Sequence, residues 1–227
     1  MQKTIATQTP TYLEKLEPIV TEIIEPAAAE IDQNGLFPAA AMRALAEAGL
    51  LGLISAEEVG GLGQGHRAAV RVMERVSQAC ASTSMVLCMH YAAAAVIEAH
   101  GPRPVREAIA AGKHTSSLAF SENGSRSHFW APVGTATEST GNGHVRLDAH
   151  KSWVTSAGQV DSYVWPPPRP PRAPAPSGWC PVKRRTARDR SVQQPGAAQQ
   201  LPPARVWPRN AGEGGHVTPM AVVLTLM

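Results

Sequence analysis

Residues 112–120 read Gly-Lys-His-Thr-Ser-Ser-Leu-Ala-Phe, and the spacing of apolar residues changes at this stretch. Before it, apolar residues recur every three or four positions, which is the period of helices with one buried face. After it, short apolar runs are separated by Gly, Ser and Asn, which indicates strands joined by turns. A block of helices followed by strands argues against an alternating, parallel βα arrangement. The sequence therefore predicts an α+β fold, with an all-α helical N-terminal domain (1–112) and a partial antiparallel β-domain (113–164).

Five helices are expected in the N-terminal domain. In the first, Thr11 and Glu14 have the spacing of a capping box. Pro18 and Pro26 interrupt its apolar pattern, so we expect a kink or a late start. The Asn-Gly pair at 34–35 then ends this helix.

Two later helices are expected to form the interior of this domain. The third has Val70, Met73, Val76 and Cys80 on one side, which we expect to face inward. The fourth runs from about 82 to 99 and is apolar nearly all round. Such a helix belongs in the middle of a bundle.

The β-domain is expected to consist of short strands. Glycine-containing turns separate them, and a last strand follows at 161–164. The earlier expected strands are residues 116–120, 133–137, 144–149 and 153–155.

The composition changes again at Trp165. Residues 165–227 hold 13 of the 20 prolines, nine Lys or Arg and two acidic residues, so this tail carries +7 and the preceding residues carry −4. A segment so rich in proline and so poor in apolar residues usually stays disordered. Reading GC-rich DNA out of frame would also yield Pro, Arg, Ala and Gly. We therefore expect a disordered or frame-shifted tail.

Several classes of protein are disfavoured by composition. Cys80, Cys88 and Cys180 are widely spaced and form no zinc-binding pattern, and His90 and His100 lack ligands at suitable spacing. Packing or surface roles are therefore expected for both histidines. The N-terminus lacks an apolar signal segment, and we find no run as long as the ~18 apolar residues of a membrane span. We expect a cytoplasmic protein that binds neither metal, membrane nor nucleic acid.

Three stretches, in order, resemble motifs of the acyl-CoA dehydrogenase family. Residues 56–63 (AEEVGGLG) are similar to the turn P-E-E-Y-G-G-x-G between early helices of that family. Residues 118–127 (LAFSENGSRS) are similar to the segment x-T-E-P-x-A-G-S that opens its β-domain. Residues 151–158 (KSWVTSAG) are similar to K-x-W-I-T-N-A. The resemblance covers residues 1–164.

The resemblance implies an FAD cofactor, an acyl-CoA thioester substrate and a homo-oligomer. It places Trp153 and Thr155 against the flavin, Ser121 near the pyrimidine side of the ring, and Ser127 at a phosphate. The complete set of implied cofactor contacts is Phe120, Ser121, Ser127, Trp153 and Thr155.

The residue types suit this chemistry, with some departures from the family pattern. A flavin ring needs a flat apolar wall and hydrogen-bond donors, and Trp153 and Thr155 supply both if they share one face of a strand. Ser121 replaces the usual threonine, and Asn123 replaces proline. Arg126 stands where glycine is common and is as suited to pairing with a phosphate as to solvation.

No catalytic residue can be assigned in this sequence. In the family, the base that removes the α-proton lies in a later helical domain, for which this sequence has no counterpart. A general base must lie within hydrogen-bond reach of its proton. We therefore expect an enzymatically inactive chain. We also expect an open sheet edge after residue 164, and hence a poorly soluble or flavin-free protein.

Three alternative functions remain. A flavin monooxygenase shares the same fold. A non-enzymatic binding module could use residues 166–176 as a polyproline ligand. The basic residues of 183–190 could form a nucleic-acid patch, which ranks lower because few aromatics accompany them.

Overall fold

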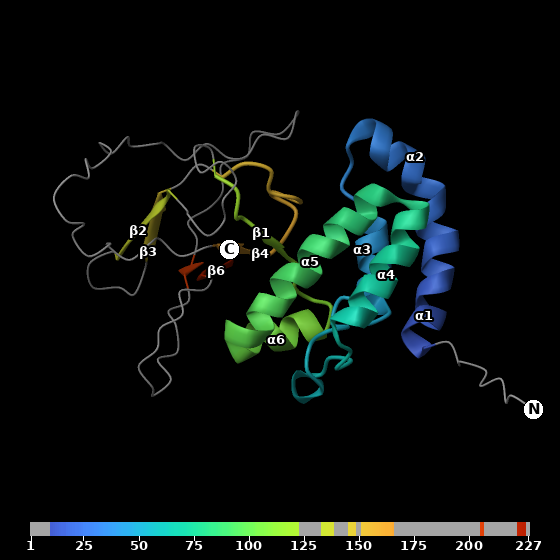
Figure 1. Ribbon diagram of the computed structural model, residues 1–227, viewed down its shortest axis with the longest axis horizontal. Coiled ribbons are helices and arrows are strands. Elements are labelled where there is room, and N and C mark those ends of the chain that lie inside the picture. The colour runs from blue at the N-terminus through green and yellow to red at the C-terminus, as the bar shows by residue number, and fades with distance from the viewer. Residues whose placement is uncertain are drawn as a thin grey trace, which may run out of the picture. The chain divides into compact units, whose positions relative to one another are not determined.

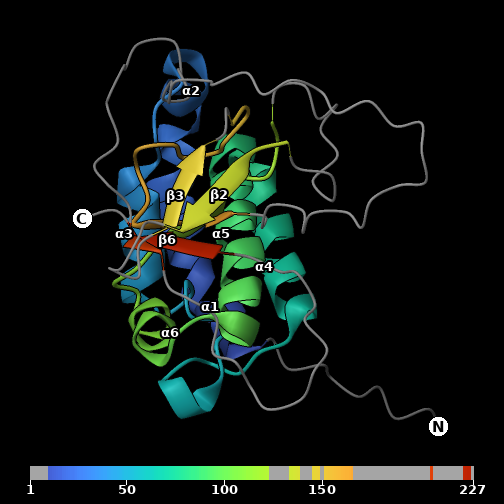
Figure 2. The same ribbon diagram turned by 90° about the vertical axis from the view of Figure 1, so that its left-hand side faces the viewer.

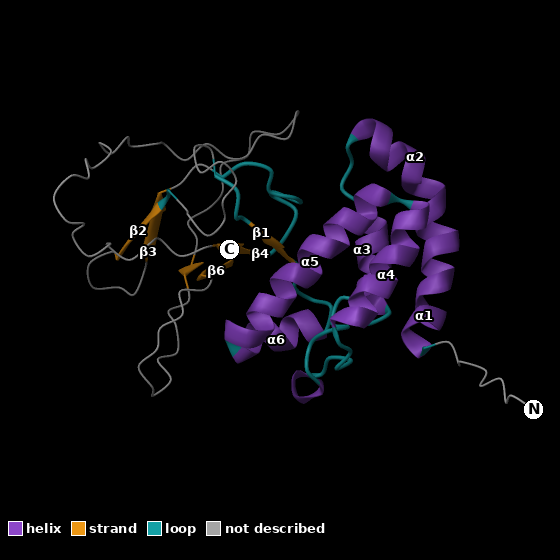
Figure 3. Cartoon of the chain, viewed as in Figure 1, coloured by secondary structure: helices purple, strands orange, loops and turns teal. Residues whose placement is uncertain are grey.

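The computed structural model describes two compact units. The first comprises Met1–Glu98 with Arg103–Thr115, and the second comprises Ala99–Pro102 with Ser116–Met227. Helices make up the first and strands the second, which confirms the α+β class (Figures 1 and 3). The predicted domain boundaries at 112 and 164 stay predictions. The described residues are 10–122, 133–138, 145–148, 151–165, 205–206 and 222–225.

The helical unit contains six α-helices together with one π-helical and one 3-10 segment among the described residues. Figures 1 and 2 both show α4 and α5 side by side, and the Ser84 hydroxyl on α5 donates to the Met73 carbonyl on α4 at 3.0 Å. The elements are α1 (Thr11–Ile19), η1 (Val20–Ile24), α2 (Glu25–Asn34), α3 (Ala39–Glu47), η2 (Glu57–Val59), α4 (His66–Ala79), α5 (Ala81–His100) and α6 (Arg103–Ala110).

The first helical stretch continues through both of its prolines. Pro18 lies inside α1, Pro26 lies in the first turn of α2, and the π-helical turn η1 joins the two helices. A π turn shifts the hydrogen-bond register, which makes room for a proline ring that would otherwise meet the carbonyl four residues earlier. The prediction that this helix starts late is therefore wrong, because α1 begins at Thr11. The capping box is also wrong, because Pro10 is the N-cap residue and no side chain caps the helix.

The core of the helical unit follows the predicted apolar faces. Leu16, Val20 and Leu45 are fully buried, and Gly35 ends α2 in the left-handed conformation, as predicted. The prediction for Val70 is wrong, since its side chain is 55% exposed. The preceding residue, Ala69, is buried instead.

Helix α5 is the apolar helix in the interior of this unit. Leu87 and Ile97 are fully buried, and the His90 ring nitrogen Nε2 lies 3.1 Å from the Leu51 carbonyl. His90 therefore has the packing role predicted for it. The neighbouring Tyr91 hydroxyl donates to the Leu50 carbonyl at 2.7 Å, and burial raises the pKa of this phenol. Among the described helices, α5 alone has the length and composition of a membrane span, which core helices share.

The strand unit contains a mixed sheet and a separate hairpin-like pair. In the sheet, β1 pairs in parallel with β4, so the antiparallel arrangement predicted for the whole domain is wrong for this pair. Strands β4 and β6, β5 and β6, and β2 and β3 pair antiparallel. The strands are β1 (Ser116–Leu118), β2 (Thr135–Glu138), β3 (Val145–Asp148), β4 (Ser162–Trp165), β5 (Arg205–Val206) and β6 (Val222–Thr225).

Strand β4 has neighbours on both sides, in the order β1-β4-β6-β5. The open edge expected after residue 164 is therefore not present, because the apolar stretch Val222–Thr225 pairs with it. This removes the edge as a reason for poor solubility. Within the tail, the structure describes only β5 and β6 after Trp165. The polyproline stretch, the basic patch and the predicted disorder lie outside the described residues.

Candidate functional site

The two segments predicted to face a cofactor lie side by side in the strand unit. The Ser152 amide donates to the Ser121 carbonyl at 3.0 Å, and the Ser117 hydroxyl donates to the Thr155 carbonyl at 2.7 Å. Glu122 and Lys151 form an antiparallel bridge between the same segments. Two hydrogen bonds and one β-bridge therefore join segments that are about 30 to 40 positions apart in the sequence.

Trp153 is the most exposed large apolar side chain of those described. Its side chain is 87% exposed, and its backbone has a φ of +58°. Bulky residues rarely adopt this left-handed conformation, which costs roughly 1–2 kcal/mol. A flat aromatic face is thus presented to solvent by a strained backbone. Such strain often marks a binding site.

The predicted strand at 153–155 is wrong. Residues 155–159 form a turn, and Thr155 belongs to it. Trp153 and Thr155 therefore do not share the face of a strand, although both remain in the segment that lies beside Ser121. The Ser-Ala-Gly sequence that follows Thr155 is the signal for this turn.

Ser156 is a second irregular residue in this turn. It has a φ of +61°, and its hydroxyl is buried without a hydrogen-bond partner among the described residues. An unpaired buried hydroxyl costs about 1–3 kcal/mol. The turn that follows Trp153 therefore holds both a strained backbone and an unsatisfied polar group.

Of the other predicted cofactor contacts, the structure describes Phe120 and Ser121 but not Ser127. Phe120 and Ser121 are half-buried and directly precede Glu122. Ser127 lies outside the described residues, so its predicted contact with a phosphate stays a prediction. The structure thus brings together Ser121, Trp153 and Thr155 in one part of the strand unit, with Phe120 adjoining.

Sequence reasoning missed the ion pair at the centre of these segments. The Lys151 ammonium contacts the Glu122 carboxylate at 2.5 Å, and the two side chains are 4% and 1% exposed. The second carboxylate oxygen accepts the amides of Val133 and Gly134 at 2.6 and 2.8 Å. The Lys151 ammonium also lies 4.2 Å from the centre of the Trp165 ring. The acid and the base both stand in the quoted motifs, but their pairing could not be read from them.

Burial decides the electrostatics of this pair. It lowers the pKa of the Lys151 ammonium, and the hydrogen bond to Glu122 opposes that shift. Burial likewise raises the pKa of Tyr163, whose hydroxyl accepts the Gly158 amide at 2.6 Å. The Tyr163 hydroxyl thereby holds Gly158, which lies in the turn at 155–159.

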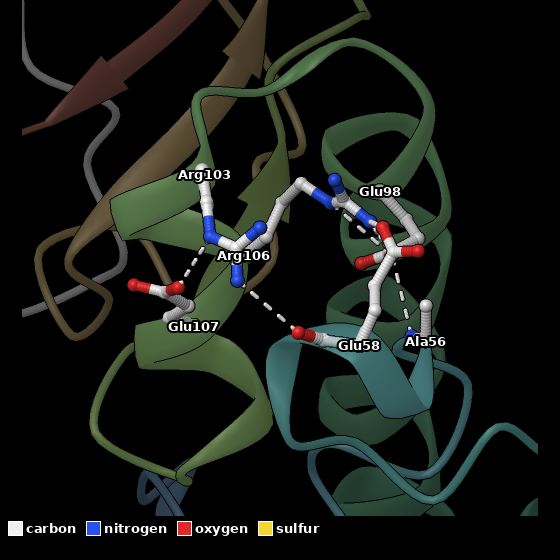
Figure 4. Close-up of polar contacts among 6 residues, drawn as sticks. All are labelled: Ala56, Glu58, Glu98, Arg103, Arg106 and Glu107. Atoms are coloured by element: carbon white, nitrogen blue, oxygen red, sulfur yellow. Dashed lines mark hydrogen bonds and ion pairs between the residues drawn. The ribbon is translucent and has the colours of Figure 1, made fainter.

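The first motif, residues 56–63, forms a different kind of site in the helical unit. Figure 4 shows Arg106 between two carboxylates: it contacts Glu98 at 2.5 Å and Glu58 at 2.9 Å. Glu98 also accepts the Ala56 amide at 3.2 Å. These hydrogen bonds raise the pKa of Arg106. The carboxylates of Glu58 and Glu98 thereby hold the loop at 56–63 against α5 and α6.

Glycine is required in this loop by close packing. A Cβ atom on Gly61 would lie 2.2 Å from the Ser55 carbonyl oxygen. The motif therefore serves the folding of the helical unit, and one of its two acids, Glu58, is engaged by Arg106.

The residues of the strand unit fit a flavin. The exposed Trp153 face suits stacking by a planar ring, and the unpaired Ser156 hydroxyl lies in the adjoining turn. Trp153 and Ser156 both lie in residues 151–158, one of the three stretches that resemble family motifs.

Comparison with known sequences points to the same family. Residues 11–112 match the family model described as "Acyl-CoA dehydrogenase, N-terminal domain". The chain is 31% identical over 144 residues to human short-chain specific acyl-CoA dehydrogenase, covering 61% of this chain and 34% of that protein. It is 27% identical over 157 residues to acryloyl-CoA reductase (NADH) of Anaerotignum propionicum, covering 67% and 40%. The chain thus spans about a third of the first relative and two fifths of the second.

Comparison with solved structures shows the fold. Butyryl-CoA dehydrogenase of Megasphaera elsdenii matches with a TM-score of 0.64 at 15% identity, over 100% of this chain and 57% of that one. Glutaryl-coenzyme A dehydrogenase matches with a TM-score of 0.63 at 23% identity, over 74% and 44%. Methanesulfinate monooxygenase of Pseudomonas fluorescens matches with a TM-score of 0.57 at 20% identity, over 70% and 39%.

Proposed function

We propose that this chain is the front part of a flavin-dependent oxidoreductase that dehydrogenates an acyl-CoA thioester, which is supported by the match of residues 11–112 to the acyl-CoA dehydrogenase N-terminal domain and by the likeness to human short-chain specific acyl-CoA dehydrogenase. The exposed Trp153 carries this proposal, since an aromatic face at 87% exposure on a strained backbone needs a partner. A planar flavin ring is such a partner. The named relatives make an acyl-CoA the favoured substrate class.

Bound flavin would supply the acceptor for a hydride from the β-carbon of the thioester. The residues of this chain bind and orient that ring. Trp153 offers the stacking face, and Ser121 and Thr155 lie in the segments beside it. Their backbones are tied together, so the polar groups and the stacking face keep a fixed relation.

Removal of the α-proton needs a base, and the carboxylates that lie in or beside the quoted motifs at Glu58, Glu98 and Glu122 are engaged within the chain. Glu122 is engaged by Lys151 and two amides, and Glu58 and Glu98 are engaged by Arg106. These contacts orient the three carboxylates toward other groups of this chain. The chain alone is therefore inactive as a dehydrogenase, and it is free of flavin as isolated.

A flavin monooxygenase on the same fold is the second candidate. The likeness to the methanesulfinate monooxygenase shows the fold alone at 20% identity, whereas the relatives found by sequence are acyl-CoA enzymes. A dehydrogenase is therefore favoured over a monooxygenase as the function of this chain. A cytoplasmic location, a role in fatty acid metabolism and assembly into a homo-oligomer complete the proposal.

The test is a titration of the full chain with FAD, followed by addition of a short-chain acyl-CoA. We expect weak binding, seen as quenched flavin fluorescence, and no bleaching of the flavin by the thioester. Bleaching by the chain alone would show that a base is present and that the proposed inactivity is wrong. Failure to bind FAD, with folding confirmed by circular dichroism, would refute the flavin site itself.

A further inference from the structure

Glu122 joins three separate segments of the strand unit through one carboxylate. One oxygen contacts the Lys151 ammonium, and the other accepts the amides of Val133 and Gly134. Glu122 directly follows Ser121, and Lys151 precedes Trp153 by two residues. The ion pair therefore lies between the two segments that carry the predicted flavin contacts.

The energetics indicate that this pair is not there for stability. Taking two charges out of water costs several kcal/mol per ion, and well-packed apolar residues are often as stable or more so. Both side chains are at least nine-tenths buried, so the cost applies in full. What a buried pair provides is one defined geometry, because each charge tolerates few other arrangements.

The geometry defined here is that of Trp153. Its left-handed backbone lies between Lys151, which the ion pair holds, and Thr155, whose carbonyl accepts the Ser117 hydroxyl. A strained residue keeps its conformation only when its surroundings hold it. Releasing Lys151 would let Trp153 relax to an ordinary backbone conformation and would move its ring.

We propose that Glu122 and Lys151 are positioning residues of the flavin site, which hold the Trp153 ring and the Ser121 segment in the arrangement that a flavin needs. This inference rests on the proposed function. It adds a role for two residues that would touch neither the flavin nor the substrate. They act through the backbone on both sides of the pair.

The first readout needs no flavin. The contribution of Trp153 to near-ultraviolet circular dichroism is the difference between a chain and the same chain carrying Trp153→Ala, measured in both the wild-type and the variant background because Trp165 also lies beside Lys151. In the double variant Glu122→Leu/Lys151→Met, which buries no charge but leaves the amides of Val133 and Gly134 without their acceptor, we expect this contribution to be lost while the urea unfolding midpoint falls less than in Glu122→Leu alone. An unchanged Trp153 signal in the double variant would overturn the proposal, whether or not the chain binds FAD.

The second readout is the binding of FAD itself. We expect about a tenfold weaker affinity and an altered visible circular dichroism of the bound flavin in the double variant, which corresponds to about 1.4 kcal/mol. Arg103→Gln/Glu107→Gln removes an exposed pair in the helical unit and serves as the matched control. Equal FAD affinity in the wild type and the double variant would overturn the positioning role. No FAD binding by the wild type would instead refute the proposed function.

Should the double variant not fold, Glu122→Asp takes its place. It keeps the charge and shifts the carboxylate by one methylene group, so we expect a folded chain with a reduced Trp153 signal and a smaller loss of FAD affinity. Lys151→Arg, which keeps the cation, is expected to restore part of the signal relative to Lys151→Met. A wild-type signal and affinity in Glu122→Asp would count against the proposal.

Discussion

The helical unit and the strand unit use their polar groups in opposite ways. In the helical unit, Arg106 pairs with both Glu58 and Glu98, and the Tyr91 hydroxyl is bonded to a backbone carbonyl. In the strand unit, Trp153 is exposed on a strained backbone and the Ser156 hydroxyl is buried without a described partner. Among the described residues, the non-glycine residues at positive φ and the unsatisfied buried hydroxyl, which break local rules, lie in the strand unit. Residues that break such rules are expected at functional sites.

This contrast can be measured because the tryptophans report on only one unit. All five occur at or after residue 130, so none lies in the helical unit. Tryptophan fluorescence therefore follows the strand unit, while far-ultraviolet circular dichroism is dominated by the helices. Each of the following substitutions is expected to change one signal more than the other.

The largest effect is expected from Glu122→Leu. It leaves the Lys151 ammonium buried without its counter-charge and removes the acceptor for two amides. Breaking a buried pair in this way costs about 3–5 kcal/mol. The fluorescence midpoint in urea should fall steeply while the helical signal changes little. Equal shifts in both signals would show that the two units unfold as one.

A slightly smaller effect is expected from Leu87→Ala, in the helical unit. Leu87 is fully buried on α5, and such truncations cost about 2–5 kcal/mol. The helical signal in urea should shift to lower concentration. Met85→Ala, on the same helix but 53% exposed, is the control and should stay within about 0.5 kcal/mol. Comparable shifts for both variants would contradict the interior position of α5.

A moderate effect is expected from Arg106→Gln. Its guanidinium is about four-fifths buried with Glu98, and losing the charged hydrogen bonds should cost about 1–2 kcal/mol. Arg103→Gln removes a pair four residues apart that is half exposed, so its expected cost is about 0.5 kcal/mol or less. Thermal unfolding followed by circular dichroism compares them. The same cost for both would mean that Arg106 does not anchor the loop.

The smallest effect is a gain, from Ser156→Gly. Glycine adopts the observed φ of +61° without strain and removes the unpaired hydroxyl, against a larger loss of backbone entropy. The net stabilisation should be about 1 kcal/mol in the fluorescence transition. Ser156→Ala keeps the strain and removes only the hydroxyl, so it should gain less. Destabilisation by Ser156→Gly would show that the hydroxyl has a partner.

Most of the helical unit could be predicted because its helices obey simple periodicity. The buried faces at Leu16 and Leu45 and the helix end at Gly35 follow from spacing and from glycine. The π turn between the prolines could not be predicted, because no local pattern specifies a shift in hydrogen-bond register.

Less of the candidate site could be predicted, because it depends on contacts between distant segments. The flavin contact of Trp153 stays a prediction, but its predicted strand is wrong, since nothing in the sequence shows a bulky residue held at positive φ. Likewise, the parallel pairing of β1 with β4 and the contact of Glu122 with Lys151 join positions far apart in the chain. The motifs identify which residues take part, and only the fold shows how they meet.

The central claim is that Trp153 provides the stacking face for a flavin. The most direct test is a flavin-fluorescence titration of the full wild-type chain and of Trp153→Ala, with Met85→Ala as an exposed control in the helical unit. We predict binding by the wild type and by Met85→Ala, and at least about tenfold weaker binding by Trp153→Ala at unchanged stability. Equal affinities for the wild type and Trp153→Ala would contradict the account.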